Sequence, residues 1–139
     1  MGKGSSKIGA VASFKRATLS ILKQHTEKIK KLSGKKYEDG TYDLDTLKPI
    51  SYNKGYQVTF WQIGDKYTQR EYADRVNEFL LASSDGKAAA GKYGGAPEVS
   101  FNVKSRREAV RLGKKYNQES IYDWETGDLI FLGGTGRKE

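Results

Sequence analysis

The spacing of hydrophobic residues changes several times along the chain, and it predicts where helices and strands lie. Between Val11 and Leu32, apolar side chains recur at steps of three and four residues. That spacing places them on one face of an α-helix. We therefore predict a long amphipathic helix from about residue 8 to Leu32.

Two later segments alternate apolar and polar residues, which is typical of strands that bury one face. They cover residues 56–63 and 98–103. Each is followed by a Ser/Thr-x-x-Glu sequence, beginning at Thr68 and at Ser105. This sequence is a capping box, in which hydroxyl and glutamate satisfy free amides of the first helical turn. The order strand, capping box, helix thus occurs twice.

Two short apolar segments, residues 120–124 and 129–132, are separated by Glu-Thr-Gly-Asp and predict a hairpin. The body from about residue 52 to 132 is then β-α-β-α-β-β. We predict an α+β fold with a small, mostly antiparallel sheet and helices on one face, since each element can then bury its apolar side. Periodicity leaves open whether the N-terminal helix packs on this body or projects from it.

Glycine and proline indicate the segments between these elements. The glycine-rich residues 86–95 predict a flexible loop, or one that covers a ligand. The predicted organisation is a flexible start with a basic helix (1–36), a connector (37–51), an α+β domain (52–132) and a tail (133–139).

Charge changes the picture of the first segment. The chain of 139 residues has a net charge of +8. Residues 1–36 hold ten basic side chains and one acid, Glu27, a net +9, so the remaining 103 residues carry −1. A basic helix joined to a nearly neutral body favours binding to nucleic acid or to a nucleic-acid-handling complex. A helix whose lysines only maintain solubility, and docking on a membrane surface or a protein, are the alternatives.

The candidate binding residues fall into two groups. On the N-terminal helix they are Lys15, Arg16, Lys23, Lys28, Lys30 and Lys31. On the last helix Arg107, Arg111 and Lys115 share one face at helical spacing. The alternative for this second group is a solvated face, because Glu108 can pair with Arg111.

Several function classes are disfavoured. The chain has no cysteine, so thiol catalysis, disulfides and thiolate metal sites are excluded. Its longest apolar runs have four residues, so we expect no membrane span and no secretory signal, and a cytoplasmic location. His25, the single histidine, lies on an apolar face, where packing is expected rather than catalysis. We predict no enzyme activity, metal or cofactor.

A second candidate site is a groove beside the predicted strands. Polar side chains near aromatic ones can bind a small molecule where a loop folds over a sheet. The candidate residues are Trp61, Tyr93, Glu98, Asn117, Gln118, Asp123 and Trp124. A small enzyme or ligand-binding domain with a groove at Glu98, Gln118 and Asp123 is therefore an alternative function. Asn117 and Gln118 can equally satisfy the end of a helix.

Three segments carry a resemblance: residues 67–72 (Tyr-Thr-Gln-Arg-Glu-Tyr), 97–101 (Pro-Glu-Val-Ser-Phe) and 115–123 (Lys-Tyr-Asn-Gln-Glu-Ser-Ile-Tyr-Asp). They resemble a small uncharacterised domain of bacteriophages and other mobile elements, over residues 52–124. The resemblance implies origin and fold, and no activity. The basic helix lies outside it.

Together these observations predict a phage or mobile-element accessory protein that acts by binding. Its basic helix would engage nucleic acid or a nucleic-acid-handling complex, including inhibition of a host-defence complex. The alternative is a virion-associated or morphogenesis component that docks through the same helix. Oligomeric state and the choice between DNA and RNA are left open.

Overall fold

The computed structural model describes residues 16–138. The helices are α2 (Ile21–Lys30), α3 (Gln69–Ala82) and α4 (Arg106–Lys115), with a short 3₁₀ helix η1 (Lys31–Ser33). The strands are β1 (Gly40–Asp43), β2 (Tyr56–Gln62), β3 (Ser83–Tyr93), β4 (Ala96–Val103), β5 (Ser120–Asp123) and β6 (Leu129–Phe131).

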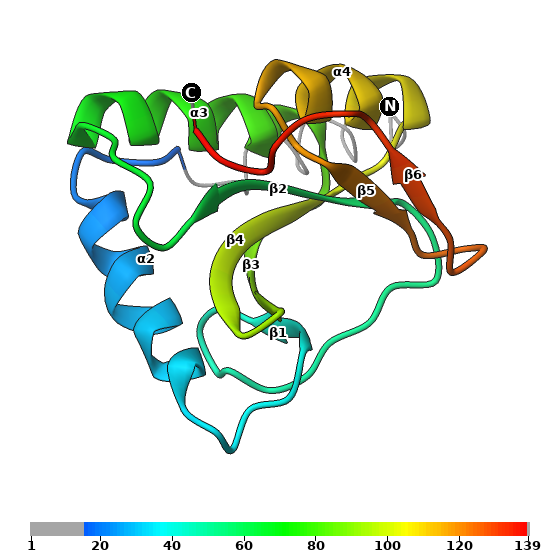
Figure 1. The fold of residues 1–139 in the computed structure, drawn as a ribbon. Coiled ribbons are helices and arrows are strands. Elements are labelled where there is room, and N and C mark those ends of the chain that lie inside the picture. The colour runs from blue at the N-terminus through cyan, green and yellow to red at the C-terminus, as the bar shows by residue number, and fades with distance from the viewer. Residues whose placement is uncertain (1–15, 139) are drawn as a thin grey trace, which may run out of the picture.

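The predicted α+β class is confirmed. Six strands form one antiparallel sheet in the order β1-β3-β4-β2-β5-β6. The sheet is strongly curved, and the three helices pack on its outer, convex side (Figure 1). The described part of the chain places no helix over the concave side, which leaves that face of the sheet open.

An aromatic cluster joins the sheet to α3. Phe60 of β2 stacks on Phe79 of α3 with ring centroids 5.0 Å apart, and its ring lies 5.3 Å from that of Tyr72. Phe101 of β4 stacks on Phe79 at 5.3 Å. Each of the four side chains is at most 1% exposed. Such pairs contribute about 0.5–1.5 kcal/mol each beyond the burial of their area, so they determine which sheet face is covered.

A β-bulge in β2 moves one predicted groove residue into this core. Thr59 pairs with Ser100 and Trp61 with Val99, so Phe60 is an extra residue in its strand. After the bulge the alternation changes phase, and Trp61 follows Phe60 onto the helix-covered side, where its ring lies 5.3 Å from Tyr72. The prediction that Trp61 lines the groove is wrong for this reason.

Two strands form where the sequence predicts a loop and a connector. The glycine-rich residues 86–95 lie mostly in β3, which pairs with β1 on one side and β4 on the other. Alanine and glycine have low strand propensity, but pairing on both edges overrides it. Small side chains also suit this position, because a Cβ on Gly91 would meet Tyr93 at 3.1 Å and Glu98 at 3.2 Å.

The sheet contains the same tight turn twice, after β1 and after β5. Asp43 Oδ1 accepts hydrogen bonds from the amides of Asp45 and Thr46, both at 2.9 Å. Asp123 Oδ1 accepts from the amides two and three residues further on, at 2.9 and 3.4 Å. In both turns the residue four after the aspartate has a positive φ, 58° at Leu47 and 77° at the corresponding glycine. The repeated sequence Tyr-Asp-x-Asp/Glu-Thr therefore forms one local structure at two places in the sheet.

Helix α2 begins later than the periodicity predicts. The structure places its start at Ile21, and residues 16–20 are not helical. The amide of Ala17 donates to Asn77 Oδ1 at 2.7 Å, and Asn77 Nδ2 donates to the Ala17 carbonyl at 3.3 Å. Asn77 thus pairs with backbone groups that a helix would use. Residues 8–15 of the predicted helix lie outside the described residues.

The question of whether the helix packs or projects is answered for α2 and η1. Ile29 and Leu32 have no exposed surface, and His25 is 6% exposed with Nδ1 2.7 Å from the Tyr72 hydroxyl. The ammonium of Lys92 on β3, itself buried, donates to two carbonyls of the segment after η1, Gly34 at 3.0 Å and Tyr37 at 2.8 Å. The apolar side of the helix therefore belongs to the core.

The two predicted capping boxes differ. Thr68 and Glu71 exchange both hydrogen bonds at the start of α3. At the start of α4, Ser105 accepts from the Glu108 amide at 3.2 Å. The Glu108 carboxylate instead receives two hydrogen bonds from Arg111, so this second box is half formed.

The last described residues follow the body closely. The amide of Gly134 donates to the Gln118 carbonyl at 3.1 Å. Arg137 pairs with Asp65 at 2.9 Å, and Lys138 pairs with Glu71 at 3.2 Å. Among residues 16–138, no helix is both long and apolar enough to cross a bilayer.

The burial of His25 predicts loss of stability in acid. Burial lowers the pKa of His25 from 6.5 to about 4. Between these values the unfolded chain binds a proton that the folded protein does not, so this contribution to stability falls as the pH drops from 6.5 to 4. We expect the His25→Gln variant to lose about 2 kcal/mol less unfolding free energy than the parent between pH 7 and 4.5. Urea unfolding at both values measures it, and equal losses in the two proteins would contradict the assignment.

Candidate functional site

The outward face of the α2 region carries a concentration of positive charge. Residues 16–36 hold seven basic side chains and one acid, a net +6. Six of the basic residues are exposed, and none of the six forms an ion pair within residues 16–138. They are Arg16, Lys23, Lys30, Lys31, Lys35 and Lys36. Lys23, Lys30 and Lys31 lie on α2 and η1, whose other side is buried, so the backbone that carries these three charges has a fixed position on the protein.

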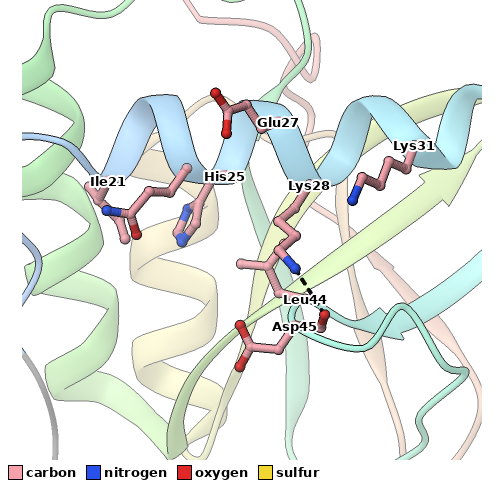
Figure 2. A pocket seen from close by; sticks show the side chains of 8 residues that line it. Ile21, His25, Glu27, Lys28, Lys31, Leu44 and Asp45 are labelled. Atoms are coloured by element: carbon pink, nitrogen blue, oxygen red, sulfur yellow. Dashed lines mark hydrogen bonds between the residues drawn. The ribbon is translucent and has the colours of Figure 1, made fainter.

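Lys28 has a different place from the other predicted lysines. It lies at a hollow of about 390 Å³ between α2 and the turn after β1, and its Nζ donates to the Asp45 carbonyl at 3.1 Å. Figure 2 shows Lys28 directed toward this turn. Lys28 therefore joins α2 to the turn after β1. Lys15, also predicted as a binding residue, lies outside the described residues.

The second predicted basic group is mostly neutralised within the protein. Arg111 makes two hydrogen bonds to Glu108, at 2.9 and 3.0 Å, and Lys115 pairs with Glu78 at 2.8 Å. Arg107 is exposed. Figure 1 shows α2 and α4 at opposite ends of the sheet, so the two groups do not form one surface. The alternative of a solvated, locally paired face describes α4 better.

The concave side of the sheet holds a groove of about 850 Å³. Side chains from β2 and β4 form its floor, β1 and β3 form one wall, and β5 with the residues around it forms the other. The floor exists because the aromatic core takes the opposite face of β2 and β4, leaving the alternate residues on this side. A concave site of this size is in the range that proteins use for small ligands.

Hydrogen bonds order the floor of the groove. Thr59 on β2 donates to Glu98 Oε1 on β4 at 2.8 Å. Beside them, Gln57 Nε2 donates to the Ser100 hydroxyl at 2.9 Å. The indole of Trp124 donates to Gln57 Oε1, also at 2.9 Å. These bonds hold the polar side chains in one arrangement, with Glu98 Oε2 making no hydrogen bond within the described residues.

The charge of the groove is opposite to that of the protein. Four carboxylates line it, and no lysine or arginine does. They belong to Glu38, Asp39, Glu98 and Glu119. Burial raises the pKa of Glu98 to about 7, against a smaller lowering by the bond from Thr59.

Aromatic rings stand on both walls. Tyr93 lies on one wall, with its hydroxyl 2.6 Å from that of Thr41. Tyr122 and Trp124 lie on the other, edge to face with ring centroids 5.0 Å apart. Burial is the main cause of a raised Tyr93 pKa, against a lowering by the hydrogen bond with Thr41.

The structure brings together four of the predicted groove residues, Tyr93, Glu98, Gln118 and Trp124. The other three predicted residues, Trp61, Asn117 and Asp123, do not line the groove. Trp61 is in the core, as described above. Asn117 has a left-handed conformation after α4 (φ 56°), and its side chain bonds to Thr135. Asp123 closes the turn after β5. Asp123 therefore does not join Glu98 in the groove lining, because its carboxylate is used by the backbone of its own turn.

Sequence reasoning missed other groove residues. Thr59, Gln57 and Tyr122 line it, and each is at an alternate position of a predicted strand, on the polar side. The alternation of residues along these predicted strands could therefore have identified them. Glu38 and Asp39 had no such signal, because they join the groove only through the pairing of β1 with β3.

The described residues contain no group of three or more His, Asp or Glu side chains arranged to hold a metal ion. No protein-family model, curated protein or solved structure matches the chain. The likeness to a phage domain therefore stays a prediction.

Glu98 gives a second prediction on pH dependence. A raised carboxyl pKa means that the folded protein holds a proton that the unfolded chain has lost between pH 4.5 and 7, so this contribution to stability falls as the pH rises. Its slope is opposite to that of His25, and a comparison of variants is needed to separate them. From pH 4.5 to 8, we expect the unfolding free energy of Glu98→Gln to gain about 3 kcal/mol relative to that of the parent. A carboxyl resonance of Glu98 titrating near 4.5 by NMR would refute this.

Proposed function

We propose that this protein acts by binding rather than catalysis, and that the outward face of α2 engages nucleic acid or a nucleoprotein complex. The supporting observation is the set of six exposed, unpaired basic residues between Arg16 and Lys36. Phosphate groups neutralise such charges with release of counterions, which supplies most of the affinity in non-specific binding.

The packing of α2 supports this function in a second way. Binding by a flexible basic arm must order that arm, which reduces affinity. Ile29 and Leu32 are fully buried, and the helix is joined to the body by Lys28 and Lys92. The cationic face is thus presented in one orientation before a partner arrives.

The same packing argues against the alternative of docking through the apolar side of this helix. Over Ile21–Ser33 that side is in contact with the core, and displacing it would expose His25, Ile29 and Leu32. Leu19, just before α2, is 49% exposed, and it is too small a surface for a stable interface. A phage setting, including inhibition of a host-defence complex, stays a prediction from the resemblance.

Binding to a duplex DNA and to a single-stranded RNA of the same length, over a series of salt concentrations, tests the proposal. With five or six phosphate contacts, log K should fall with log salt with a slope of about −5. We expect the triple variant Lys23→Gln, Lys30→Gln, Lys31→Gln to reduce the slope by about 2.5 for duplex DNA. The control is Lys54→Gln, Lys87→Gln, Lys104→Gln, which removes the same charge from exposed positions elsewhere. Equal losses in both variants, or affinity that does not change with salt, would refute the proposal.

Glu27 offers a test in the opposite direction. It is exposed and is the one acid between residues 16 and 36, on the same helix side as Lys23 and Lys30 at steps of four and three. A phosphate near those lysines is repelled by it. We expect Glu27→Gln to tighten binding about two- to fivefold at low salt. A damaged fold cannot produce this gain, and weaker or unchanged binding would exclude this face as the contact surface.

A further inference from the structure

The groove on the concave side has a composition that the α2 face does not explain. In a protein of net charge +8, it collects four carboxylates without any lysine or arginine. A phosphate ligand would meet repulsion there. A cation would meet attraction there, because the groove lining holds acids and no basic side chain.

The aromatic walls point to the same ligand chemistry. Lysine and arginine cations bind over the faces of tyrosine and tryptophan rings, and more strongly where water is displaced. Tyr93 on one wall, and Tyr122 with Trp124 on the other, line the same groove as Glu98. The free oxygen of Glu98 is the acceptor between them, since Thr59 uses the other one.

The edge of the sheet next to the groove indicates the kind of molecule that carries the cation. β6 is the last strand, so its outer edge has no strand partner within the described residues. Leu129 lines the groove and is 53% exposed; Phe131, two residues on, is 78% exposed. An unpaired edge with exposed apolar side chains is the surface to which extended peptides add.

We propose that the groove binds a lysine or arginine side chain presented by an extended basic segment of a partner protein. The cation lies between the rings of the two walls and pairs with Glu98, while apolar groups of the segment contact Leu129 and Phe131. This site is separate from the α2 face and does not depend on nucleic-acid binding.

The net charge of the whole protein predicts that groove binding and nucleic-acid binding differ in their dependence on salt. A basic peptide is repelled by the net charge at long range, so recognition has to come from contacts within the groove. Added salt should therefore weaken groove binding far less than it weakens nucleic-acid binding.

Calorimetry with defined peptides tests the proposal on the full chain. The probes are acetylated, amidated hexapeptides in which threonine alternates with arginine, lysine or glutamine, together with free spermidine. We expect the arginine or lysine peptide to bind at least about tenfold more tightly than the glutamine peptide. Equal binding of the glutamine peptide would overturn the role of the cation. Spermidine binding as tightly as the peptides would overturn the assignment to a polypeptide.

Variants locate the site. Glu98→Gln keeps the size of the side chain and an acceptor for Thr59, and we expect it to weaken the cationic peptide about tenfold. The control is Glu125→Gln, which removes an exposed acid of the turn between β5 and β6 that does not line the groove, and should leave affinity unchanged. Tyr122→Leu should weaken binding as well. Equal affinity of Glu98→Gln and the parent would refute the site.

Two further outcomes are distinguished. If light scattering shows that the protein alone dimerises and that Glu98→Gln abolishes the dimer, the occupant is a second copy and the proposal of a different partner fails. The triple variant of Lys23, Lys30 and Lys31 should bind the peptides as the parent does. The proposal for the groove and the proposal for the α2 face are thus tested with different probes and different variants, so that one can fail without the other.

Discussion

The structure depends on the packing of Phe60 against Phe79, Phe101 and Tyr72. This contact joins two central strands to α3 and commits one face of the curved sheet to the helices. A strand residue that turns to one side leaves its neighbour on the other. The same contact therefore leaves a row of polar residues on the concave side, which becomes the floor of the groove. The core and the candidate site therefore lie on opposite faces of the same strands.

The charge of the protein is likewise divided by its packing. Helix α2 buries Ile29 and Leu32 in the core and turns its basic residues outward, while the acids of the groove lie on the opposite side of the sheet. A net charge of +8 describes neither surface. We propose a polyanion as the ligand of the first surface and a cation as the ligand of the second, and the net charge alone would indicate only the first.

Parts of the fold were predictable because their causes are local. The helix starts at Thr68 and Ser105 follow from capping, and the strand around Val58 from its period of two. Other parts have causes distant in sequence. The alanines and glycines of β3 have no strand signal of their own, and they form a strand because β1 and β4 pair with both edges. Trp61 changes side through a bulge that no local pattern indicated.

The sequence by itself determined which segments could bury a face, the concentration of basic residues before residue 37, and the absence of thiol chemistry. It also contained the repeated Tyr-Asp turn, whose hydrogen bonds all lie within a few residues. Only the tertiary structure decided that α2 packs on the body, that Asp123 forms hydrogen bonds within its own turn, and that Glu38 and Glu98 line one groove. The physical reason is that helices and turns are stabilised by neighbours in the chain, whereas a site on a sheet is assembled by strand pairing between distant segments.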